Sequence, residues 1–409
     1  MTPVGLIPED WNIIQLADYI VDINDGPFGS NLKSEHYTLD REVRIIQLGN
    51  VGDSGWNDEN VKYTTFEHAS TLKRCIVPYG TIIIAKMMPA GRAIICPSSE
   101  PAYIQGSDVV KVVFTDSIDK DFFIYLTKSK AYLEQIESGV QGSTRARTNI
   151  GKIKSLKLPL PSVEEQKRIA GALLSVDKMI VALDEAISKK RQIKEGLMQQ
   201  LLTGKTRLPG FSGEWKREML GKHATVLRGG SPRPIESFLT TDPDGINWIK
   251  IGDVGVGAKY IVKTEERIIP EGASRSRKVK AGDFLLSNSM SFGRPYILKI
   301  DGCIHDGWLV IQDYNDSFDT DYLYYALNAS ETIEQYKSMA AGSSVLNLNK
   351  DIVRRVLVSI PSIEEQRAMA LVLSSADEEI VSLESKRDKY ILVKQGMMQE
   401  LLTGKTRLI

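Results

Sequence analysis

Two short patterns in the chain could carry catalysis, and each is explained better in another way. The tripeptide G-K-T stands at 204–206 and again at 404–406, but a phosphate-binding loop needs a glycine five residues before that G-K, and glutamine occupies the position in both places. The E-x-K at 165–167 resembles nuclease carboxylates, yet it becomes E-x-R at 365–367 and lies in the first turn of an expected helix, where capping explains it. We therefore expect neither a nucleotide-binding loop nor a nuclease centre.

The side chains that most often bind metals or act as nucleophiles are few and scattered. They form no H-E-x-x-H and no C-x-x-C pattern, and the cysteines are odd in number. The residues are His36, His68, His223, His305, Cys75, Cys96 and Cys303. The sequence also contains no N-P-P-[FY] motif of the adenine-methylating type and no G-x-G-x-x-G after a strand. We predict no metal site, no catalytic residue and no cofactor bound by this chain.

The composition is that of an ordinary globular protein with more than one domain. The chain has 409 residues, 42% of them hydrophobic and 25% charged, which exceeds what a single core usually supports. The beginning of the sequence has no basic and apolar leader pattern, and no run of about 18 apolar residues occurs. These features, with the cysteine usage, predict a cytoplasmic protein.

The charge balance limits what the chain can bind unaided. Lys and Arg together number 52, as do Asp and Glu, whereas an autonomous DNA-binding protein usually carries a basic excess. Phosphate neutralisation supplies much of the affinity of a protein for DNA. If this chain binds DNA, a partner must therefore supply much of the positive charge.

One long internal repeat organises the chain. Residues 161–208 realign on 361–408 without a gap, at a constant offset of 200, and 25 of the 48 positions are identical. Weaker matches extend upstream, and Trp11 and Trp215 open the two copies. Since such a repeat marks a repeated structural unit, we predict two globular domains, each followed by a helix, with boundaries at 1–160, 161–208, 209–360 and 361–409.

Both helical segments have recognisable ends and an apolar seam. Each begins at an S-x-x-E capping box, at 162–165 and 362–365, and ends near Gly204 or Gly404. Between these ends the 4-3 spacing of a coiled coil predicts that the two helices pack against each other through Ile169, Leu173, Val176, Ile180, Leu183, Ile187, Met369, Leu373, Ala376, Ile380 and Leu383. Charged residues then interrupt the seam, which is expected to turn toward Ile193, Leu197, Val393 and Met397.

The order of domains and helices predicts their arrangement. If each domain sits at the start of its own helix, the helices pair most simply antiparallel, with the domains at opposite ends of a rod of about 60 Å and a pseudo-two-fold axis between them. The identical L-L-T-G-K-T-R-L at the end of both helices is more than packing alone would require.

The globular segments are predicted to be mixed α/β domains. Short apolar strands between Gly- and Asp-rich turns are expected around 44–48, 81–86, 108–114, 248–251, 284–287 and 308–312. Amphipathic helices are expected at 121–135 and 321–336. The order of the strands in the sheet does not follow from the sequence.

The chain resembles the specificity (HsdS) subunits of type I restriction-modification systems. The resemblance rests on P-S-[VI]-E-E-Q opening each helix, on [LM]-M-x-x-L-L-T-G-K-x-R-L closing it, and on D-G-P-F-G-S at 25–30 followed by Leu32-Lys33. It covers essentially the whole chain and is most specific in the helices. The second copy departs from it, with R-G-G-S-P-R at 228–233 in place of D-G-P-F-G-S.

The resemblance implies a non-catalytic DNA-reading subunit. Each domain of such a subunit is a target-recognition domain that reads one half of a split, asymmetric double-stranded DNA site, and the helices fix the unread gap. The implied partners are two methyltransferase (HsdM) subunits, which use S-adenosylmethionine, and translocase-nuclease (HsdR) subunits, which use ATP and Mg²⁺. These partners would supply the catalysis that the sequence lacks.

Candidate DNA contacts are inferred from residue type and loop position. Polar and basic side chains in loops read base edges and phosphates. The richest loop is 141–149, Q-G-S-T-R-A-R-T-N, whose counterpart at 341–349 has no arginine, as expected if the two copies read different bases. The full set of candidates is Ser30, Asn31, Lys33, Lys86, Arg92, Ser143, Thr144, Arg145, Arg147, Asn149, Arg228, Ser231, Arg233, Lys250, Asn288, Ser289, Arg294, Ser343, Ser344, Asn347 and Asn349.

Two other interpretations remain open. The chain could be a coiled-coil scaffold whose globular copies bind protein rather than DNA, or an enzyme with an unfamiliar site in one copy. The absence of a carboxylate, His or Cys cluster shared by both copies argues against an enzyme. Binding to DNA in the presence of a methyltransferase distinguishes a DNA reader from a protein scaffold.

Overall fold

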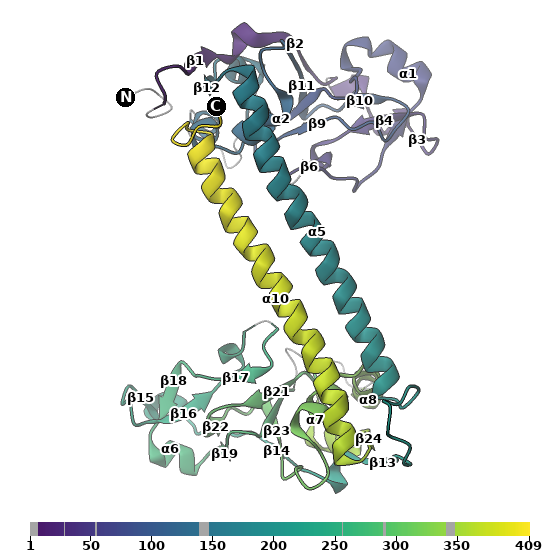
Figure 1. Ribbon diagram of the computed structural model, residues 1–409, viewed down its shortest axis with the longest axis vertical. Coiled ribbons are helices and arrows are strands. Elements are labelled where there is room, and N and C mark those ends of the chain that lie inside the picture. Colours follow the sequence, from purple (N-terminus) through teal and green to yellow (C-terminus); the bar gives the residue numbers. More distant parts are fainter. Residues whose placement is uncertain are drawn as a thin grey trace. The chain divides into compact units, whose positions relative to one another are not determined.

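The computed structural model describes residues 7–409 apart from 28, 54, 139–146, 256, 289–291 and 341–347. Two helices of 39 residues dominate it: α5 (Val163–Leu201) and α10 (Ile363–Leu401), teal and yellow in Figure 1. The chain divides into two compact units, one formed by the residues up to Asp184 with Lys386–Ile409, the other by Glu185–Ser385. Each unit therefore contains one globular domain, the first part of the helix that follows it and the last part of the other long helix.

The globular part of the first unit contains two four-stranded sheets. The first has the order β2-β11-β8-β9 and the second the order β10-β4-β7-β3, while β1 pairs with β12 and β5 with β6. The strands are β1 (Asn12–Gln15), β2 (Ile20–Asp25), β3 (Tyr37–Thr38), β4 (Val43–Ile46), β5 (Val51–Gly52), β6 (Gly55–Trp56), β7 (Tyr63–Thr64), β8 (Ile82–Ala85), β9 (Ala93–Ile95), β10 (Tyr103–Gln105), β11 (Val109–Phe114) and β12 (Lys157–Leu160). The shorter helices are α1 (Phe66–Thr71), α2 (Lys120–Leu126), α3 (Lys130–Glu137) and α4 (Ile150–Lys154).

The second unit repeats this plan with two five-stranded sheets. Their orders are β14-β23-β20-β21-β17 and β15-β18-β16-β22-β19, and β13 pairs with β24 as β1 does with β12. The strands are β13 (Lys216–Met219), β14 (Thr225–Arg228), β15 (Leu239–Thr240), β16 (Ile246–Ile249), β17 (Tyr260–Ile261), β18 (Glu266–Ile268), β19 (Arg277–Val279), β20 (Phe284–Ser287), β21 (Pro295–Leu298), β22 (Gly302–Ile304), β23 (Trp308–Gln312) and β24 (Leu357–Ile360). The shorter helices are α6 (Pro270–Ser274), α7 (Thr320–Asn328), α8 (Ser330–Ala340) and α9 (Lys350–Arg355). The predicted mixed α/β class and the internal repeat are confirmed.

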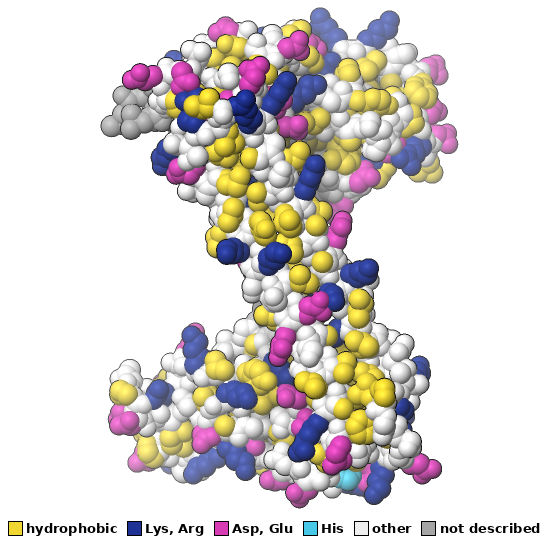
Figure 2. Space-filling view, viewed as in Figure 1, with side chains coloured by type: hydrophobic (Ala, Val, Ile, Leu, Met, Phe, Trp, Pro, Cys, Tyr) yellow, Lys and Arg dark blue, Asp and Glu magenta, His cyan; other side chains and the backbone are white. Residues whose placement is uncertain are grey.

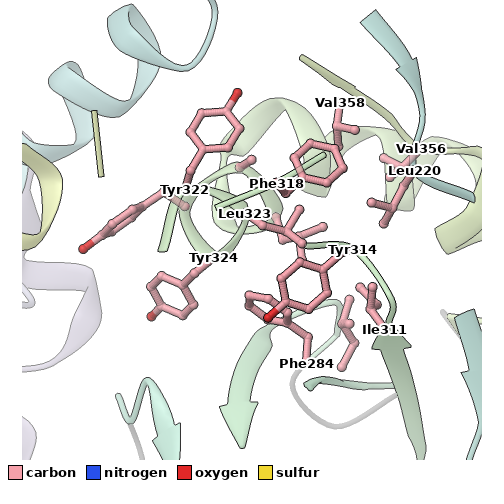
Figure 3. Packing of buried hydrophobic residues seen from close by; sticks show 14 of the residues in the cluster. Leu220, Phe284, Ile311, Tyr314, Phe318, Tyr322, Leu323, Tyr324, Val356 and Val358 are labelled. Atoms are coloured by element: carbon pink, nitrogen blue, oxygen red, sulfur yellow. The ribbon is translucent and has the colours of Figure 1, made fainter. Parts of the chain in front are cut away.

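The main core of the second unit lies between the sheet β14-β23-β20-β21-β17 and the helices that cover it. Aromatic side chains of β20 and of the segment from 314 to 325 interlock there with aliphatic ones, as Figure 3 shows for Phe284, Ile311, Tyr314, Phe318 and Leu323. The same core continues into both long helices through Met198, Leu201, Met369 and Leu373. The first unit repeats this arrangement with Ile169, Leu173, Leu401 and Leu402. Each long helix is therefore a part of the core at both of its ends.

The long helices run antiparallel within each unit. In the first unit Asp177 meets Lys394 and Asp184 meets Arg387, so rising numbers on α5 face falling numbers on α10. In the second unit Lys190 meets Glu379 and Lys194 meets Asp377. The predicted seam residues are buried at Ile169, Leu173, Leu183, Ile187, Met369, Leu373 and Ile380 and half-buried at Val176, Ile180, Ala376 and Leu383.

The expected turn of the seam is confirmed for Leu197 and Met397, which are half-buried and pack against the cores, and is wrong for Ile193 and Val393. Ile193 and Val393 are 46% and 43% exposed, whereas the charged residues that interrupt the seam stay in it. Lys194 and Lys394 keep their places because each forms an ion pair with an aspartate of the facing helix at 2.5 Å. Ion pairing, rather than a rotation of the helices, resolves the break in the apolar pattern.

The single amphipathic helices expected at 121–135 and 321–336 are each two helices. In the first copy α2 ends at Leu126 and α3 begins after Ser129, whose hydroxyl accepts the backbone N–H of Tyr132 at 3.3 Å. A serine cap of this kind starts a new helix and changes its direction. Helices α7 and α8 show the same break in the second copy. Among the described residues, no helix combines the length and the apolar composition needed to cross a membrane.

Candidate nucleic-acid interface

One edge of the sheet β2-β11-β8-β9 brings distant loops of the first unit together. Strand β11 lies between β2 and β8 and is antiparallel to both, with Val110 opposite Asp25 and Val109 opposite Ala85. The end of β2, the end of β8 and the start of β11 therefore share one sheet edge. The loops that follow β2 and β8 and the loop that precedes β11 meet there, which we call the first polar edge.

The second unit forms the same edge from β14, β23 and β20. Arg228, the last residue of β14, lies opposite Leu309, and Ser287 at the end of β20 lies opposite Trp308. The loops after β14 and β20 and the loop before β23 thus form a second polar edge. The register of two separate sheets produces the same construction twice.

A glycine allows the loops of each polar edge to approach one another. A Cβ atom on Gly26 would lie 1.8 Å from the carbonyl oxygen of Gly106, and one on Gly229 would lie 2.1 Å from that of His305. No side chain fits at such distances, so both positions require glycine. The D-G-P-F-G-S and R-G-G-S-P-R segments therefore share a glycine with the same structural role, although their side chains differ.

The basic residues of the first polar edge are paired with carboxylates. Lys86 is nearly buried and its Nζ lies 3.0 Å from Asp25, while Arg147 lies 3.0 Å from Asp108. Arg147 also forms a backbone bridge with Met87, and the Lys86 N–H donates to the Asp108 carbonyl. Lys86 and Arg147, 61 residues apart in sequence, are thus brought together. Lys86 supports the loop that begins at Asp25 as well as being a predicted DNA contact.

The loop after β2 is supported by two histidines that sequence analysis had treated as unrelated. His36 and His68 stack with ring centroids 4.0 Å apart. His36 Nδ1 accepts the N–H of Lys33, and His68 Nε2 lies 3.0 Å from the carbonyl of Asn31. The side chains of Ser30, Asn31 and Lys33 remain exposed, so the loop is anchored through its backbone.

The second polar edge gathers arginines around one carboxylate. Asp306 accepts the hydroxyl of Ser231 at 2.9 Å and lies 3.6 Å from Arg233, which is 83% exposed. The Arg228 Nε donates to the Asp306 carbonyl. Burial opposes ionisation of Asp306, but the hydrogen bond from Ser231 and the charges of His305 and Arg233 outweigh it and lower its pKa.

Sequence analysis missed Arg277, which belongs to the same group. Its Nε donates to the backbone carbonyl of Arg228 at 3.2 Å, and its side chain is exposed. The basic run R-S-R-K-V-K at 275–280 was the available signal. With Arg228 and Arg233, Arg277 gives the second polar edge three arginines around the single carboxylate of Asp306, whereas Lys86 and Arg147 of the first edge each have an aspartate partner.

Other predicted contact residues have structural partners. Asn149 and Asn349 cap α4 and α9 through their side-chain oxygens, Arg92 lies 3.3 Å from Asp53, and Lys250 lies 2.6 Å from Glu266. The Arg294 guanidinium lies 5.7 Å from the ring centre of Tyr296. Asn288 joins the second polar edge, since its N–H donates to the Gly307 carbonyl and its own carbonyl accepts the N–H of Leu348. Ser143, Thr144, Arg145, Ser289, Ser343, Ser344 and Asn347 lie outside the described residues.

A hollow of about 380 Å³ opens beside the first polar edge. Pro27, Gly29 and the segment 106–108 line one part of it, and Gln47, Asn60 and Lys62 line another. Carboxamide and ammonium groups are suited to base edges and phosphates. We therefore add Gln47, Asn60 and Lys62 to the candidate contacts. Among the described residues, no three His, Cys, Asp or Glu side chains are grouped so as to hold a metal ion.

The identical ends of the long helices serve a packing role that the sequence did not reveal. Arg407 pairs with both carboxylate oxygens of Glu165, at 2.7 and 2.9 Å, and with Asp10. The indole of Trp11 donates to Glu165 at 3.1 Å. Arg207, Glu365 and Trp215 repeat this group in the second unit. We call these groups the end clamps; each ties the segment that follows one long helix to the first turn of the other.

The end clamps correct two expectations. Glu165 and Glu365 follow the capping-box pattern, and the serine hydroxyls do accept their N–H groups, but their carboxylates bind arginine and tryptophan. Packing explains the identity of the two leucines, which are buried, and of the arginine, which binds the glutamate. Gly204 and Gly404 have φ of +71°, and a Cβ on either would lie 3.3 Å from a tryptophan ring.

Removing Arg407 should destabilise the first unit measurably. Glu165 is 5% exposed, so Arg407→Ala leaves a nearly buried carboxylate without its charge partner. We expect the free energy of unfolding to fall by about 2–3 kcal/mol, less than for a fully buried pair because Arg407 is 23% exposed. Urea unfolding measures the change. Lys405→Ala is the matched control, because Lys405 is 68% exposed, and it should change stability by less than about 0.5 kcal/mol.

The same clamp predicts a pH dependence. The hydrogen bonds from Arg407, with a smaller contribution from Trp11, hold the pKa of Glu165 below the ordinary glutamate value of 4.5 despite partial burial. A lowered folded-state pKa contributes stability above pH 4.5 and loses it as the pH falls through the folded value. The difference in stability between the native chain and Arg407→Ala should therefore shrink in acid. A difference that is constant from pH 7 to pH 3 would contradict this origin.

The chain thus consists of two equivalent units, each of which contains parts of both long helices and presents a polar sheet edge. The family model described as "Type I restriction modification DNA specificity domain" matches residues 8–194 and 215–392, and the chain belongs to this family. The two matched regions cover both copies of the repeat, and the resemblance inferred from the sequence is confirmed.

Relatives and solved structures agree with this assignment. The specificity subunit of the type I restriction enzyme MjaVIII of Methanocaldococcus jannaschii is 23% identical over 431 residues, covering 98% of this chain and 94% of that protein. The crystal structure of the HsdS subunit from Thermoanaerobacter tengcongensis covers 99% of this chain and 100% of its own, with a TM-score of 0.51 and 15% identity. A chain from a structure on complex assembly and conformational transition of the type I R-M system gives a TM-score of 0.62 at 16% identity, covering 98% of this chain and 100% of that chain.

Proposed function

We propose that this specificity subunit reads a bipartite, asymmetric double-stranded DNA site, one half with each globular domain. The observation that carries the proposal is the pair of polar edges, which share one backbone construction and one required glycine while presenting different side chains. Two readers of common design and different chemistry suit two different half-sites. The long helices, each part of the core of both units, set the number of unread base pairs between the halves.

The chemistry of modification and cleavage is assigned to partner subunits. Two HsdM methyltransferases would bring S-adenosylmethionine, and HsdR translocase-nuclease subunits would bring ATP and Mg²⁺. Exposed apolar side chains on the long helices offer surfaces on which HsdM can dock: Leu174, Met179, Val181 and Leu392 in the first unit, and Leu371 and Val381 in the second. Figure 2 shows hydrophobic side chains along these helices on the face turned to the viewer. Such a patch on a protein surface typically marks a protein interface.

The purified chain alone should bind DNA weakly and with little sequence preference. Its net charge is zero, and the basic residues Lys86 and Arg147 of the first polar edge are already paired with aspartates. Since phosphate contacts supply much of the affinity, we expect a gel shift at physiological salt to need micromolar or higher chain alone and to tighten by about a hundredfold when HsdM is added.

The same experiment separates the proposal from a protein-binding scaffold. A DNA reader shifts target DNA in preference to scrambled DNA once HsdM is present. A scaffold assembles with HsdM but shows no preference between the two. Arg277→Ala should weaken binding of both DNAs to the complex, because this exposed arginine adds positive charge to the second edge. The Lys178→Ala substitution, at an exposed position of α5, should not weaken binding.

A further inference from the structure

A buried glutamine attaches each globular domain to the start of the long helix that follows it in the sequence. Gln166, in the first turn of α5, accepts the N–H of Asp119 at 2.8 Å and donates to the carbonyl of Ser117 at 3.0 Å. Gln366 makes the same contacts with Asp319 and Ser317 in the second unit. Both glutamines are fully buried. Each one fixes the turn before α2 or α7 to the start of the long helix, and we call this attachment the pivot.

A second attachment lies farther along the helix and includes the other long helix. In the first unit the hydroxyl of Tyr125 on α2 donates to Asp177 of α5 at 2.7 Å, and Lys394 of α10 binds the other oxygen of Asp177 at 2.5 Å. The Lys394 ammonium also lies 5.7 Å from the ring centre of Tyr125. We call these three residues the first latch. Burial and the hydrogen bond to Asp177 raise the pKa of Tyr125, so the hydroxyl keeps its proton as the donor.

The second unit contains the same latch, and each of its three residues lies 200 positions from its counterpart in the first latch. Tyr325 donates to Asp377 at 2.7 Å, and Lys194 binds the other oxygen of Asp377 at 2.5 Å. Lys194 lies 5.6 Å from the ring centre of Tyr325. The globular domains have diverged widely, yet the distances of the two latches agree within 0.1 Å.

The spacing between the pivot and the latch along α5 bears on the tilt of the domain. Gln166 and Asp177 are 11 residues apart, close to three helical turns, so both lie on one face of α5 and about 16 Å apart along its axis. The pivot, the end clamp and the shared core all hold the domain near the start of α5. The latch adds a contact about three turns farther along the helix, where it restricts the tilt of the domain on that base. Because Lys394 belongs to α10, all three residues of the first latch meet only when α5 and α10 are packed together.

We propose that Asp177 and Asp377 are positioning residues that fix the tilt of each recognition domain on the helix pair and so restrict the gap length of the DNA site. The proposal rests on the proposed function for its consequence in DNA, but not for the tilt itself. A domain that swings about its pivot changes the distance between its polar edge and the other reader. Loss of a latch should therefore relax the gap while the bases read in each half stay the same.

The tilt can be measured in the full-length chain without DNA. Nitroxide labels at Glu67→Cys on α1 and Lys178→Cys on α5, both exposed positions of the first unit, report the domain against its helix by electron-electron double resonance. The native Cys75, Cys96 and Cys303 are buried, and burial raises the pKa of Cys96 to about 12, so these thiols resist labelling near neutral pH. Tyr125→Phe and Asp177→Asn should each widen the distance distribution roughly twofold.

The variants are chosen to leave the fold intact. Tyr125→Phe removes one oxygen and keeps the ring in the core, and Asp177 is 31% exposed, so water can replace the lost donor. Asp184→Asn is the matched control: it breaks the ion pair with Arg387 between the same two helices, and Asp184 is 53% exposed. The control should leave the distance distribution unchanged. A distribution of native width in Tyr125→Phe and Asp177→Asn would overturn the proposal.

The functional arm uses the chain assembled with HsdM and a DNA library in which the gap between the half-sites varies by one base pair. The ratio of methylation at the wrong gap to methylation at the native gap should rise about tenfold in Tyr125→Phe and Asp177→Asn, and not in Asp184→Asn. A wider distance distribution with unchanged gap discrimination would overturn the link between tilt and gap. If the native assembly methylates no library member, the proposed function fails, and the distance measurement still decides whether the latch fixes the tilt.

Discussion

Exchanging residues 1–160 for the same region of a relative with a different target should change one half of the methylated DNA motif and leave the other half unchanged. The reason is that each polar edge is formed within one unit: β2, β8 and β11 supply the first, and β14, β20 and β23 supply the second. The expected effect is a complete change of the specified bases on one side of the motif, read by methylome sequencing.

The structure defines how the exchange must be made. The incoming domain has to keep the equivalents of Trp11 and Tyr125, because these side chains bind Glu165 and Asp177 of the long helix. The reciprocal exchange of 209–360 is the control and should alter only the other half. A change in both halves after either exchange would show that the domains do not read independently.

Lengthening both long helices by four residues should lengthen the unread gap by one or two base pairs. Four helical residues add about 6 Å and roughly 400° of rotation, close to one full turn, while B-DNA rises about 3.4 Å per base pair. The half-sequences should not change, because the insertion leaves both polar edges untouched. Methylome sequencing of the variant reads the new gap directly.

The ion pairs show where to insert. Lys190, where the apolar seam first falters, pairs with Glu379, so an insertion in one helix at that point would shift its partners out of register. Insertions after Glu185 and after Ser385 fall between the Asp184–Arg387 and Lys190–Glu379 pairs and keep each unit's own contacts. A two-residue insertion at both points is the control, since roughly 200° of rotation should turn one reader away and abolish methylation. An unchanged gap with full activity would show that the helices do not set the spacing.

The repeated parts of the fold were predictable because their signal is local or periodic. The 4-3 spacing and the proline-serine starts of the helices follow from helix geometry, and the short apolar runs placed the strands near 82–85, 109–114 and 308–312. The break between α2 and α3 was missed because Ser129 competes with helix continuation only through its side chain, which an apolar pattern does not register.

The polar edges and the end clamps could not be predicted, because they depend on strand order and on distant pairings. Lys86 meets Asp25 only because β11 lies between β2 and β8. Arg407 meets Glu165 across 242 positions of sequence, so its role is invisible to local patterns. Residue type alone also could not tell a free basic group from a paired one. Lys86 was selected as a candidate contact and is buried against Asp25, whereas Arg277 was not selected and is exposed.

Methylome sequencing of a methylation-free host that expresses this chain with its HsdM partner tests the central claim most directly. We expect one new adenine-methylated motif with two different half-sequences separated by a gap of fixed length, and no such motif when this chain is omitted. Loss of Gly26 or Gly229 by substitution to valine should remove the motif, because each side chain would collide with a carbonyl oxygen about 2 Å away. A methylation pattern that is the same with and without the chain, or a continuous motif with no gap, would contradict the account.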